Sequence, residues 1–254
     1  GIQSHALASV KGKILCQLSD AQIIDISHTQ EGFNLQQTAY HFKQAFIHFP
    51  EGSFHFVFND LYADKNHKLL YAYENKQHIF CADNGFLTML FDDKPMQMYC
   101  LQDKIQPYTF LTVADHFIAS VRSILLYNEF PIVSIDVSKI IIRHPSKPFY
   151  TNDMLEAQVL YIDPYGNVIL NVQRKQLEEI AAGRKFKILF MRDEEINAIS
   201  THYNDVPEGE KLCLFNTANY LEIAVNKGNA ARLFGFQEMT DRSLFYNSVK
   251  LFFT

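Results

Sequence analysis

The chain has 254 residues, of which 48% are hydrophobic and 20% are charged, and its formal net charge is −5. This composition is typical of globular domains and excludes an intrinsically disordered chain. The acidic balance and the absence of a long basic run argue against a nucleic-acid-binding protein. A chain of this length can form one large domain or two unequal ones with substantial cores.

Metal and membrane sites are not indicated. The four cysteines lack Cys-x-x-Cys spacing, so structural zinc is not expected and reduced core thiols are the better interpretation. No apolar stretch reaches the roughly 20 residues that cross a bilayer, and no signal peptide is visible. We therefore expect a cytoplasmic protein that contacts neither membrane nor nucleic acid and holds no metal.

The first part of the chain alternates helical and strand patterns. Apolar residues at helical spacing follow a candidate N-cap at Ser4, and Asn34 opens a second helical pattern. An apolar strand is expected at 54–58, a hairpin at 68–73 and 78–82 around Asn75 and Lys76, and a third helix at 114–127. This alternation predicts an α/β/α layered domain with a central, mostly parallel sheet.

The composition changes at residues 143–148, where two prolines lie within four residues and favour an extended connection. We place an N-terminal domain at 1–143, a linker at 144–152 and a C-terminal domain at 153–254. One helix is expected in the C-terminal domain, at 176–182. The strands expected there predict a small β-barrel or sandwich, and they lie at 157–162, 168–172, 186–190, 211–215, 220–225 and 250–253.

Residues 163–167 (Asp-Pro-Tyr-Gly-Asn) lie between two expected strands and have two interpretations. Proline, glycine and asparagine are ordinary turn residues, so the segment can be a simple β-turn. Alternatively, the turn holds Asp163 and Asn167 beside a ligand and offers Tyr165 as a stacking face. A second polar and aromatic segment, 216–226, has a similar character and contains Asn216, Thr217 and Glu222.

Three residues in the first part are further candidates. Asp60 follows the apolar strand, and ligands of α/β sheets bind beyond the carboxyl ends of strands. His67 lies seven residues later and is either a proton shuttle or an ordinary loop histidine. Asn84 belongs to an Asp-Asn-Gly sequence that is either a turn or part of a site. The chain contains no nucleophile elbow, dinucleotide fingerprint or phosphate loop.

Together these segments resemble the S-adenosylmethionine hydroxide adenosyltransferases, which are relatives of the fluorinating and chlorinating enzymes. The resemblance covers nearly the whole chain and consists of segments in the correct order. Phe33 falls where relatives carry an aromatic or apolar wall. The matching segments are 10–12, 25–28 (Asp-Ile-Ser-His), 83–85, 163–167 with Tyr165 in place of phenylalanine, and 220–231.

The resemblance implies an N-terminal α/β domain, a C-terminal β-barrel and a homotrimer with sites between neighbouring subunits. It implies that S-adenosylmethionine and water give adenosine and methionine, with no other cofactor. Asp60 matches the acid of the family's Asp-Arg-His catalytic set. Asp163 and Asn167 would contact the methionine portion or nearby backbone, and Tyr165 would pack on the ring. Asn216, Thr217 and Glu222 would hold the amino-acid group or the adenine edge.

Several positions depart from the family pattern. His67 occupies the arginine position of the catalytic set, and Leu111 follows the Thr-Phe dipeptide where the histidine is expected. Gly1 aligns with the glycine of the family's opening Asp-Phe-Gly, which would place the first strand upstream. Ala6 replaces the serine of fluorinating relatives, so halide attack is not expected. These departures leave two hypotheses, a hydrolase that uses Asp60 and His67 and a non-catalytic protein that binds adenosine or S-adenosylmethionine.

Overall fold

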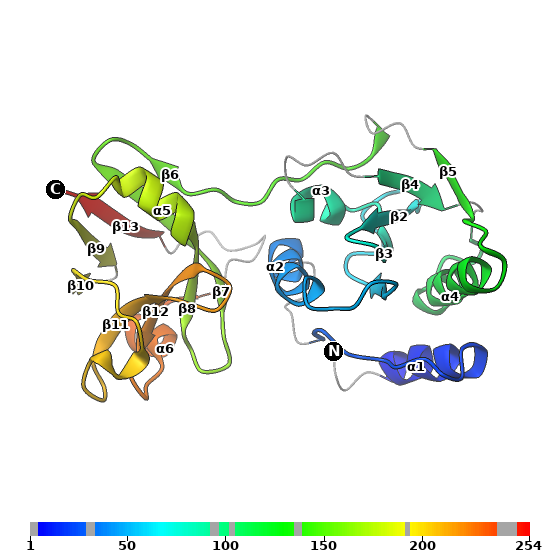
Figure 1. Cartoon of the computed structure of the whole chain (residues 1–254), viewed down its shortest axis with the longest axis horizontal. Helices are drawn as coiled ribbons and strands as arrows, with labels where there is room; N and C mark the ends of the chain where they lie inside the picture. Colours follow the sequence, from blue (N-terminus) through cyan, green and yellow to red (C-terminus); the bar gives the residue numbers. More distant parts are fainter. Residues whose placement is uncertain are drawn as a thin grey trace. The chain divides into compact units, whose positions relative to one another are not determined.

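The computed structural model describes residues 5–28, 34–91, 97–101, 105–134, 139–190, 194–237 and 248–254. Contacts divide the chain into two compact units, Gly1–Pro145 and Ser146–Thr254. Figure 1 labels the helices and strands of both units. Each unit has its own buried core and is described separately below.

The first unit is built on a five-stranded sheet in the order β1-β3-β2-β4-β5. Its strands are β1 (Phe54–Val57), β2 (Leu69–Glu74), β3 (Gln77–Ala82), β4 (Gln97–Leu101) and β5 (Ile132–Ser134). Its helices are α1 (His5–Gln17), α2 (Leu35–Phe46), α3 (Phe86–Phe91) and α4 (Phe110–Tyr127).

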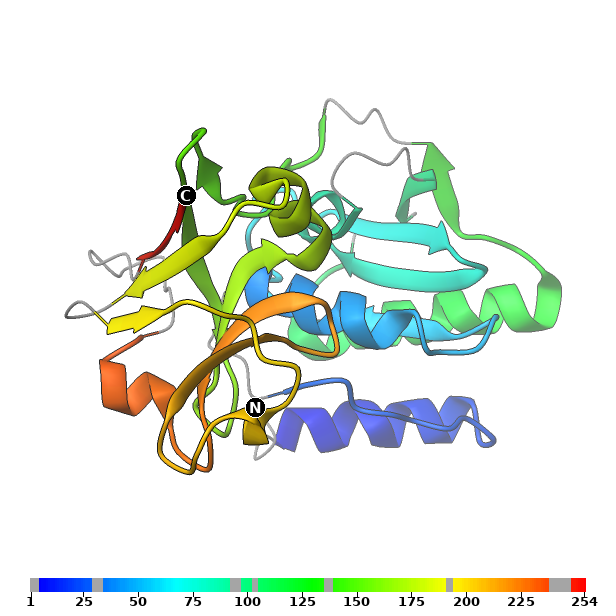
Figure 2. The ribbon, with the colours of Figure 1, turned by 60° about the vertical axis from the view of Figure 1, so that its left-hand side comes forward.

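Helices cover both faces of this sheet, which confirms the predicted α/β/α layering. On one face, Leu70 and Ala72 of β2 share a core with side chains of α2 and α3. On the other face, Tyr71 shares a core with Val113 and Phe117 of α4. This division follows from the period of two along a strand, which points alternate side chains to opposite faces. Figure 2 shows the same elements from a second direction.

The prediction of a mostly parallel sheet was wrong, because the sheet is mixed. Among the described strands only β1 and β3 pair in parallel, whereas the β2–β3, β2–β4 and β4–β5 pairs are antiparallel. The predicted hairpin explains much of this, since consecutive strands joined by two residues must run antiparallel. Asn75 and Lys76 form its turn with φ of 49° and 57°, the left-handed values that favoured two-residue hairpin turns require.

Helix ends in the first unit depend on side-chain caps. Asn34 accepts a hydrogen bond from the backbone of Gln37 at 3.0 Å, which confirms its predicted N-cap role. Helix α4 begins at Phe110, four residues before the predicted start, because Thr109 and Thr112 cap each other reciprocally. A threonine pair is not the usual Ser/Thr-x-x-Glu signature, so apolar periodicity alone placed the start too late.

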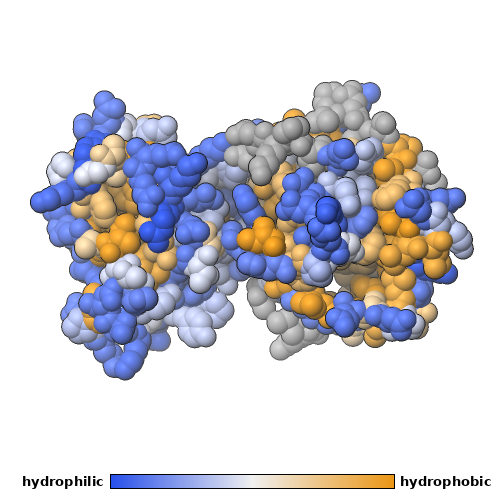
Figure 3. Space-filling view, viewed as in Figure 1, coloured by the Kyte–Doolittle hydropathy of each residue, from blue (hydrophilic) through white to orange (hydrophobic). Residues whose placement is uncertain are grey.

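Helix α4 is also long and apolar enough to cross a membrane by length and composition, and it is the one such helix in the described ranges. Its apolar character has a local cause, since Val113, Phe117, Ile118 and Val121 are buried in the core of the first unit. Near its C-terminal end Leu125 and Leu126 are exposed. In Figure 3, apolar side chains gather at the far right, where Figure 1 places α4 and β5.

The second unit is an antiparallel, nearly closed barrel in the order β10-β9-β13-β7-β8-β12-β11, with β6 paired to β7. The two end strands approach through Ser200, after β10, which forms an isolated parallel bridge with β11 and donates its backbone N–H to the carbonyl of Cys213 at 2.7 Å. The strands are β6 (Phe149–Tyr150), β7 (Met154–Ile162), β8 (Val168–Gln173), β9 (Phe186–Phe190), β10 (Glu194–Ile196), β11 (Lys211–Phe215), β12 (Tyr220–Val225) and β13 (Ser248–Phe253). The helical elements are α5 (Arg174–Ala181), η3 (Tyr203–Asp205) and α6 (Ala230–Phe234).

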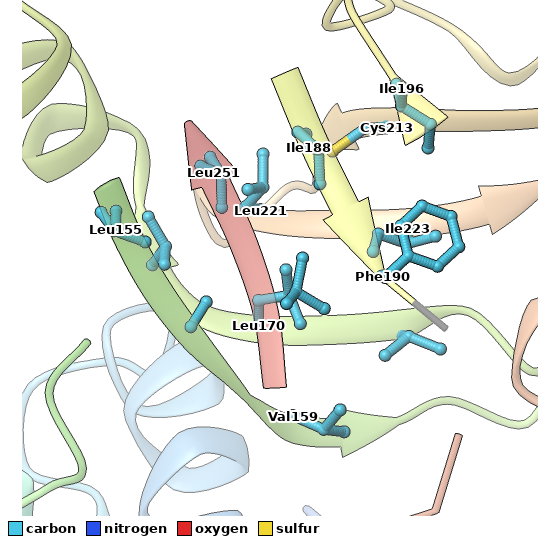
Figure 4. Packing of buried hydrophobic residues seen from close by; sticks show 14 of the residues in the cluster. Leu155, Val159, Leu170, Ile188, Phe190, Ile196, Cys213, Leu221, Ile223 and Leu251 are labelled. Carbon is cyan, nitrogen blue, oxygen red and sulfur yellow. The ribbon is translucent and has the colours of Figure 1, made fainter. Parts of the chain in front are cut away.

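Side chains from alternate positions of these strands fill the barrel interior (Figure 4). Leu221 and Ile223 of β12 point inward with Leu155, Leu170 and Leu251 of neighbouring strands. The barrel rather than the sandwich is therefore the correct alternative. The predicted strands at 186–190, 211–215 and 220–225 match β9, β11 and β12.

Candidate functional site

Asp60 and Asn84 meet where two neighbouring parallel strands end. Asp60 follows β1 and Asn84 follows β3, and these two strands run side by side in the same direction. The side-chain amide of Asn84 donates to the backbone carbonyls of Asn59 at 2.7 Å and Asp60 at 3.5 Å. In α/β sheets this is the edge at which ligands bind.

Asn84 itself is fully buried, and both ends of its side chain are used within the protein. Its amide holds the backbone around Asp60, and its Oδ1 accepts a hydrogen bond from the backbone of Phe86 at 2.9 Å. The side chain of Asn59 in turn donates to Thr38 of α2. The chain around Asp60 is therefore held in place by groups from β3 and α2.

The carboxylate of Asp60 differs from most acids of this unit because nothing in the described ranges donates a hydrogen bond to it. The residue is half-buried, and its φ of 43° is left-handed. Aspartate is one of the few non-glycine residues that adopt this conformation at modest cost. A half-buried carboxylate with unused acceptor capacity at a strand end is suited to bind a water or a cation.

The loop from Asp60 to Lys68 is organised by Asp64. Its carboxylate accepts hydrogen bonds from the backbone N–H groups of Asn66 and Lys68, both at 3.2 Å. Burial alone would raise the pKa of Asp64, but these N–H groups and the Lys68 charge lower it. His67 also has a left-handed φ of 52°, and its ring stacks on Tyr108 with centroids 4.1 Å apart.

Asp83 and Lys68 form a charged pair beside this loop that the sequence did not reveal. Asp83 is fully buried, accepts a hydrogen bond from the backbone of Ile141 at 2.9 Å and lies 3.6 Å from Lys68 Nζ. Burial raises the pKa of Asp83, while Ile141 and Lys68 oppose the rise. The spacing of Asp83 and Lys68 gave no signal, because the hairpin of β2 and β3 is what brings them together.

In the second unit, Asp163 and Asn167 make the tight turn between β7 and β8. The carboxylate of Asp163 accepts hydrogen bonds from the backbone of Tyr165 at 2.9 Å and Asn167 at 2.8 Å. It also accepts one from the Asn167 side chain at 3.0 Å. All three hydrogen bonds lie within the turn, as expected if the segment is a simple β-turn. Tyr165, at the tip, is 78% exposed and is the member of this segment with a ring open to a partner.

Glu222 is a buried acid on the outer face of the barrel, since its neighbours Leu221 and Ile223 point inward. It is only 3% exposed and accepts a hydrogen bond from the Tyr203 hydroxyl at 2.7 Å. Burial raises the pKa of Glu222, and the nearby charge of Asp163 adds to the rise. Tyr203 was missed by sequence reasoning, because η3 has no apolar or motif signal of its own.

Asn216 and Thr217 belong to the turn before β12. The Asn216 side chain accepts hydrogen bonds from the backbone of Ala218 and Tyr220, both at 3.0 Å, while Thr217 is exposed. Asn171 of β8 accepts a hydrogen bond from the backbone of Gln158 and donates one to the Ser146 hydroxyl. Phe33, predicted to line the site, lies outside the described residues.

The structure thus gathers the candidates into two sets. Asp60, Asn84 and the loop that carries His67 belong to the first unit. Asp163, Asn167 and Glu222 belong to the second, together with the turn of Asn216 and Thr217. In the described residues there is no group of three or more side chains that could hold a metal ion. Leu111, which follows the Thr-Phe dipeptide, is partly exposed in the first turn of α4.

Comparison with protein families matches both parts of the chain. Residues 1–137 match the family described as SAM hydroxide adenosyltransferase N-terminal domain, where SAM is S-adenosylmethionine. Residues 157–242 match the corresponding C-terminal domain.

Individual relatives agree with this match. A curated (R)-S-adenosyl-L-methionine hydrolase from Methanocaldococcus jannaschii is 21% identical, over 97% of this chain and 93% of the relative. A crystal structure of an uncharacterized conserved protein from Thermotoga maritima superposes with a TM-score of 0.77 at 22% identity, covering 99% of this chain and 96% of the other. A conserved hypothetical protein from Thermus thermophilus gives a TM-score of 0.69 at 20% identity, covering 100% and 96%. These structures share the fold with this chain.

Proposed function

The chain belongs to the S-adenosylmethionine hydroxide adenosyltransferase family, and from this premise we propose that it hydrolyses SAM to adenosine and L-methionine. The observation that supports this most is the half-buried Asp60 beyond the carboxyl end of β1, where Asn84, just after the neighbouring parallel strand, bonds the backbone and leaves the Asp60 carboxylate unused. The name of the Methanocaldococcus relative describes the same reaction class.

The proposed chemistry is an in-line displacement at the ribose C5′. A water oxygen forms a bond to C5′ while the C5′–sulfur bond breaks, and the bonding electron pair returns to sulfur as the thioether of methionine. The water loses one proton, so SAM and water give adenosine, methionine and a proton. Because the sulfonium is already a good leaving group, the protein must chiefly align the water and limit its solvation.

Asp60 has the properties this step needs. Its carboxylate can accept a hydrogen bond from the attacking water, orient its lone pair toward C5′ and take the proton. As an anion it also favours a sulfonium in its neighbourhood. His67, on the same loop, is assigned the second position of the catalytic set, which is arginine in the family pattern. There its ring nitrogens can bond the water or relay its proton.

The other predicted residues are assigned to substrate binding. Tyr165 and Thr217 are exposed and can contact the ligand directly. The side chains of Asn84, Asp163 and Asn216 already bond the local backbone, and that of Asn167 bonds the Asp163 carboxylate, so these four would act mainly by shaping the site. Phe33 and Glu222 complete the proposed set. We further propose a cytoplasmic homotrimer with sites between subunits and no cofactor other than the substrate, as the family resemblance implies.

A second function, binding without catalysis, is favoured by one specific observation. Two of the three catalytic positions differ from the family pattern, since His67 and Leu111 stand where arginine and histidine are expected. Histidine titrates near neutral pH and cannot replace the permanent charge and forked donors of arginine. A protein of this kind would retain adenosine or SAM and release no product.

One experiment separates the two functions. The purified protein is incubated with SAM, with and without chloride, and the products are separated by chromatography while calorimetry measures binding. Hydrolysis predicts equal amounts of adenosine and methionine, independent of chloride. Binding heat without adenosine at high protein concentration would support the alternative, and no binding of any adenosine compound would exclude both. Asp20→Asn, at an exposed acid outside the loop of residues 60–68, is the matched control for Asp60→Asn.

A further inference from the structure

Three rings gather on the loop that carries the proposed catalytic residues. The His67 and Tyr108 rings are nearly parallel, with an interplanar angle of 7° and centroids 4.1 Å apart. Tyr62 meets both of them edge-on, at 5.6 Å from Tyr108 and 6.0 Å from His67. Tyr62 and His67 belong to the loop itself, whereas Tyr108 comes from the segment before α4.

Tyr108 is fixed by the start of α4. It precedes the N-cap Thr109, whose side chain accepts a hydrogen bond from the backbone of Thr112. The Thr112 hydroxyl in turn donates to the carbonyl of Pro107, on the other side of Tyr108, at 2.7 Å. The backbone on both sides of Tyr108 is therefore tied to a helix whose inner face is buried in the core.

The hydroxyl of Tyr108 reaches the backbone next to Asp60. It donates to the carbonyl of Leu61 at 2.9 Å, and Leu61 is buried in the same core cluster. Burial raises the pKa of Tyr108 to about 12, and the neighbouring Tyr62 and Asp64 add to the rise. The hydroxyl thus keeps its proton and remains a donor throughout the neutral range.

The Tyr108 side chain therefore contacts the loop at two places, the carbonyl of Leu61 beside Asp60 and the ring of His67. Within the loop, Asp64 bonds the backbone of Asn66 and Lys68 but holds neither the His67 ring nor the carbonyl of Leu61. Tyr108 supplies these two contacts from a rigid helix end. Stacking uses the face of the imidazole, so the ring nitrogens at its edge stay available for hydrogen bonding.

We propose that Tyr108 is a positioning residue, whose ring orients His67 and whose hydroxyl fixes the backbone beside Asp60. This proposal rests on the hydrolytic function proposed above, because it assigns Tyr108 an effect on turnover through those two residues. Small displacements of a catalytic group lower the rate of chemistry much more than they weaken substrate binding.

The test separates the ring from the hydroxyl. Tyr108→Phe keeps the stack and removes the donor, and Tyr108→Leu removes both. Each is made in the wild-type and His67→Ala backgrounds, and kcat and KM for SAM are measured. Tyr99→Leu, a partly buried tyrosine of β4 in the same core cluster, controls for the loss of an aromatic side chain.

We expect Tyr108→Leu to lower kcat by about 100-fold with KM unchanged. Loss of the hydroxyl in Tyr108→Phe should cost about threefold to tenfold, the effect of one neutral hydrogen bond. In the His67→Ala background, Tyr108→Leu should cost no more than Tyr108→Phe, because the partner of the ring is gone. The proposal would be overturned if Tyr108→Leu left kcat unchanged. It would also be overturned if Tyr108→Leu lowered kcat by the same factor in the His67→Ala background as in the wild type.

A spectroscopic readout does not depend on turnover. The imidazole resonances of His67, assigned by their disappearance in His67→Ala, should be shifted by the stacked ring. That shift should be lost in Tyr108→Leu and kept in Tyr108→Phe and Tyr99→Leu. If wild-type protein produces no adenosine, the proposed function fails, and this measurement alone decides whether Tyr108 positions His67. Resonances that do not move in Tyr108→Leu would contradict the positioning role.

Discussion

Asp60 and Asp163 have similar sequence surroundings and different structural roles. Each follows a strand and precedes an exposed tyrosine by two residues, Tyr62 in the first unit and Tyr165 in the second. Asp163 joins antiparallel strands through a tight turn, and its carboxylate is used by N–H groups of that turn. Asp60 follows a strand that pairs in parallel, and its backbone is held by Asn84. In the described residues no group donates a hydrogen bond to its carboxylate. An acid at a strand end is therefore a better site candidate when a neighbouring residue performs the structural task.

The largest effect expected from this comparison is on turnover. Asp60→Asn should lower kcat about 100-fold or more, because a neutral amide cannot take the proton of the attacking water. Asparagine also accepts left-handed backbone, so the φ of 43° at this position should persist and the melting temperature should be nearly unchanged. Steady-state kinetics and thermal unfolding check both parts. A large loss of stability would mean that Asp60, like Asp163, is structural.

Glycine substitutions compare the turns of the two units. Gly166→Ala should destabilise the second unit by about 2–3 kcal/mol, because a left-handed φ of 85° is strained for alanine and the new Cβ would overlap the Asn229 side chain. Asn229 caps α6, so the cap is displaced as well.

Gly85→Ala is the matched variant in the first unit, with a φ of 88°. There the new Cβ would lie 2.5 Å from Cγ and 2.8 Å from Cβ of Arg143, at the base of the side chain, where relief requires the Arg143 backbone to shift. Its cost should therefore also be about 2–3 kcal/mol, from backbone strain and overlap together. Urea unfolding measures both variants, and a cost of about 1 kcal/mol or less for either would show that the neighbouring residue moves aside without loss.

Removing the carboxylate of the turn should cost stability in the second unit. Asp163→Ala leaves two backbone N–H groups and one amide without their acceptor and should lower the free energy of unfolding by about 2 kcal/mol. Hydrogen exchange should locate the loss at the β7–β8 turn. Unchanged exchange there, combined with loss of SAM binding, would instead give Asp163 the direct ligand role that its sequence position also allows.

The smallest effects concern pH, and the two units should respond with opposite signs. Burial lowers the pKa of His55 and His78 in the first unit below the ordinary histidine value of 6.5. As the pH falls below 6.5, the unfolded chain therefore binds more protons than the folded chain. The stability that these histidines contribute is present above pH 6.5 and is lost as the pH falls. Burial raises the pKa of Glu222, so its contribution is present below pH 4.5 and is lost as the pH rises through the folded-state value.

Hydrogen exchange resolved by peptide, corrected for the intrinsic pH dependence, checks these signs. Acidification from pH 7 to pH 5.5 should reduce protection of β1 and β3, and His55→Gln should weaken that dependence. As the pH falls toward 4.5, β12 should gain protection, and Glu222→Gln should remove the gain. Asp83 opposes the histidines in the first unit because burial raises its pKa as well. The same sign in both units, unaffected by either variant, would contradict the assignment.

Much of the fold could be predicted from the sequence because most of its helices and strands depend on local patterns of apolar and polar residues. The barrel strands are short, mostly apolar runs between polar segments, so β9, β11 and β12 could be predicted to the residue. The sheet of the first unit was harder, because whether strands pair in parallel depends on contacts distant in sequence. Helix α3 and strand β10 were missed, since six and three residues are too few to show a period.

The candidate site could be predicted in part. Asp60, His67 and Asn84 followed from a strand end, a loop and a family resemblance. Tyr108, Lys68 and Tyr203 did not, because each acts through a partner that only the folded chain brings near. Asp163 and Asn167 show a different limit of sequence-based prediction. The same residue types are typical of a β-turn and of a ligand site, so the sequence alone does not separate the two.

The most direct test of the central claim uses water enriched in oxygen-18. If water attacks C5′ of SAM, the adenosine formed by the wild-type protein carries the heavy oxygen in its 5′-hydroxyl, the methionine is unlabelled, and Asp60→Asn forms almost none of either product. Mass spectrometry of the separated products reads both outcomes. Adenosine without the label, or no adenosine from wild-type protein that binds SAM, would contradict the account.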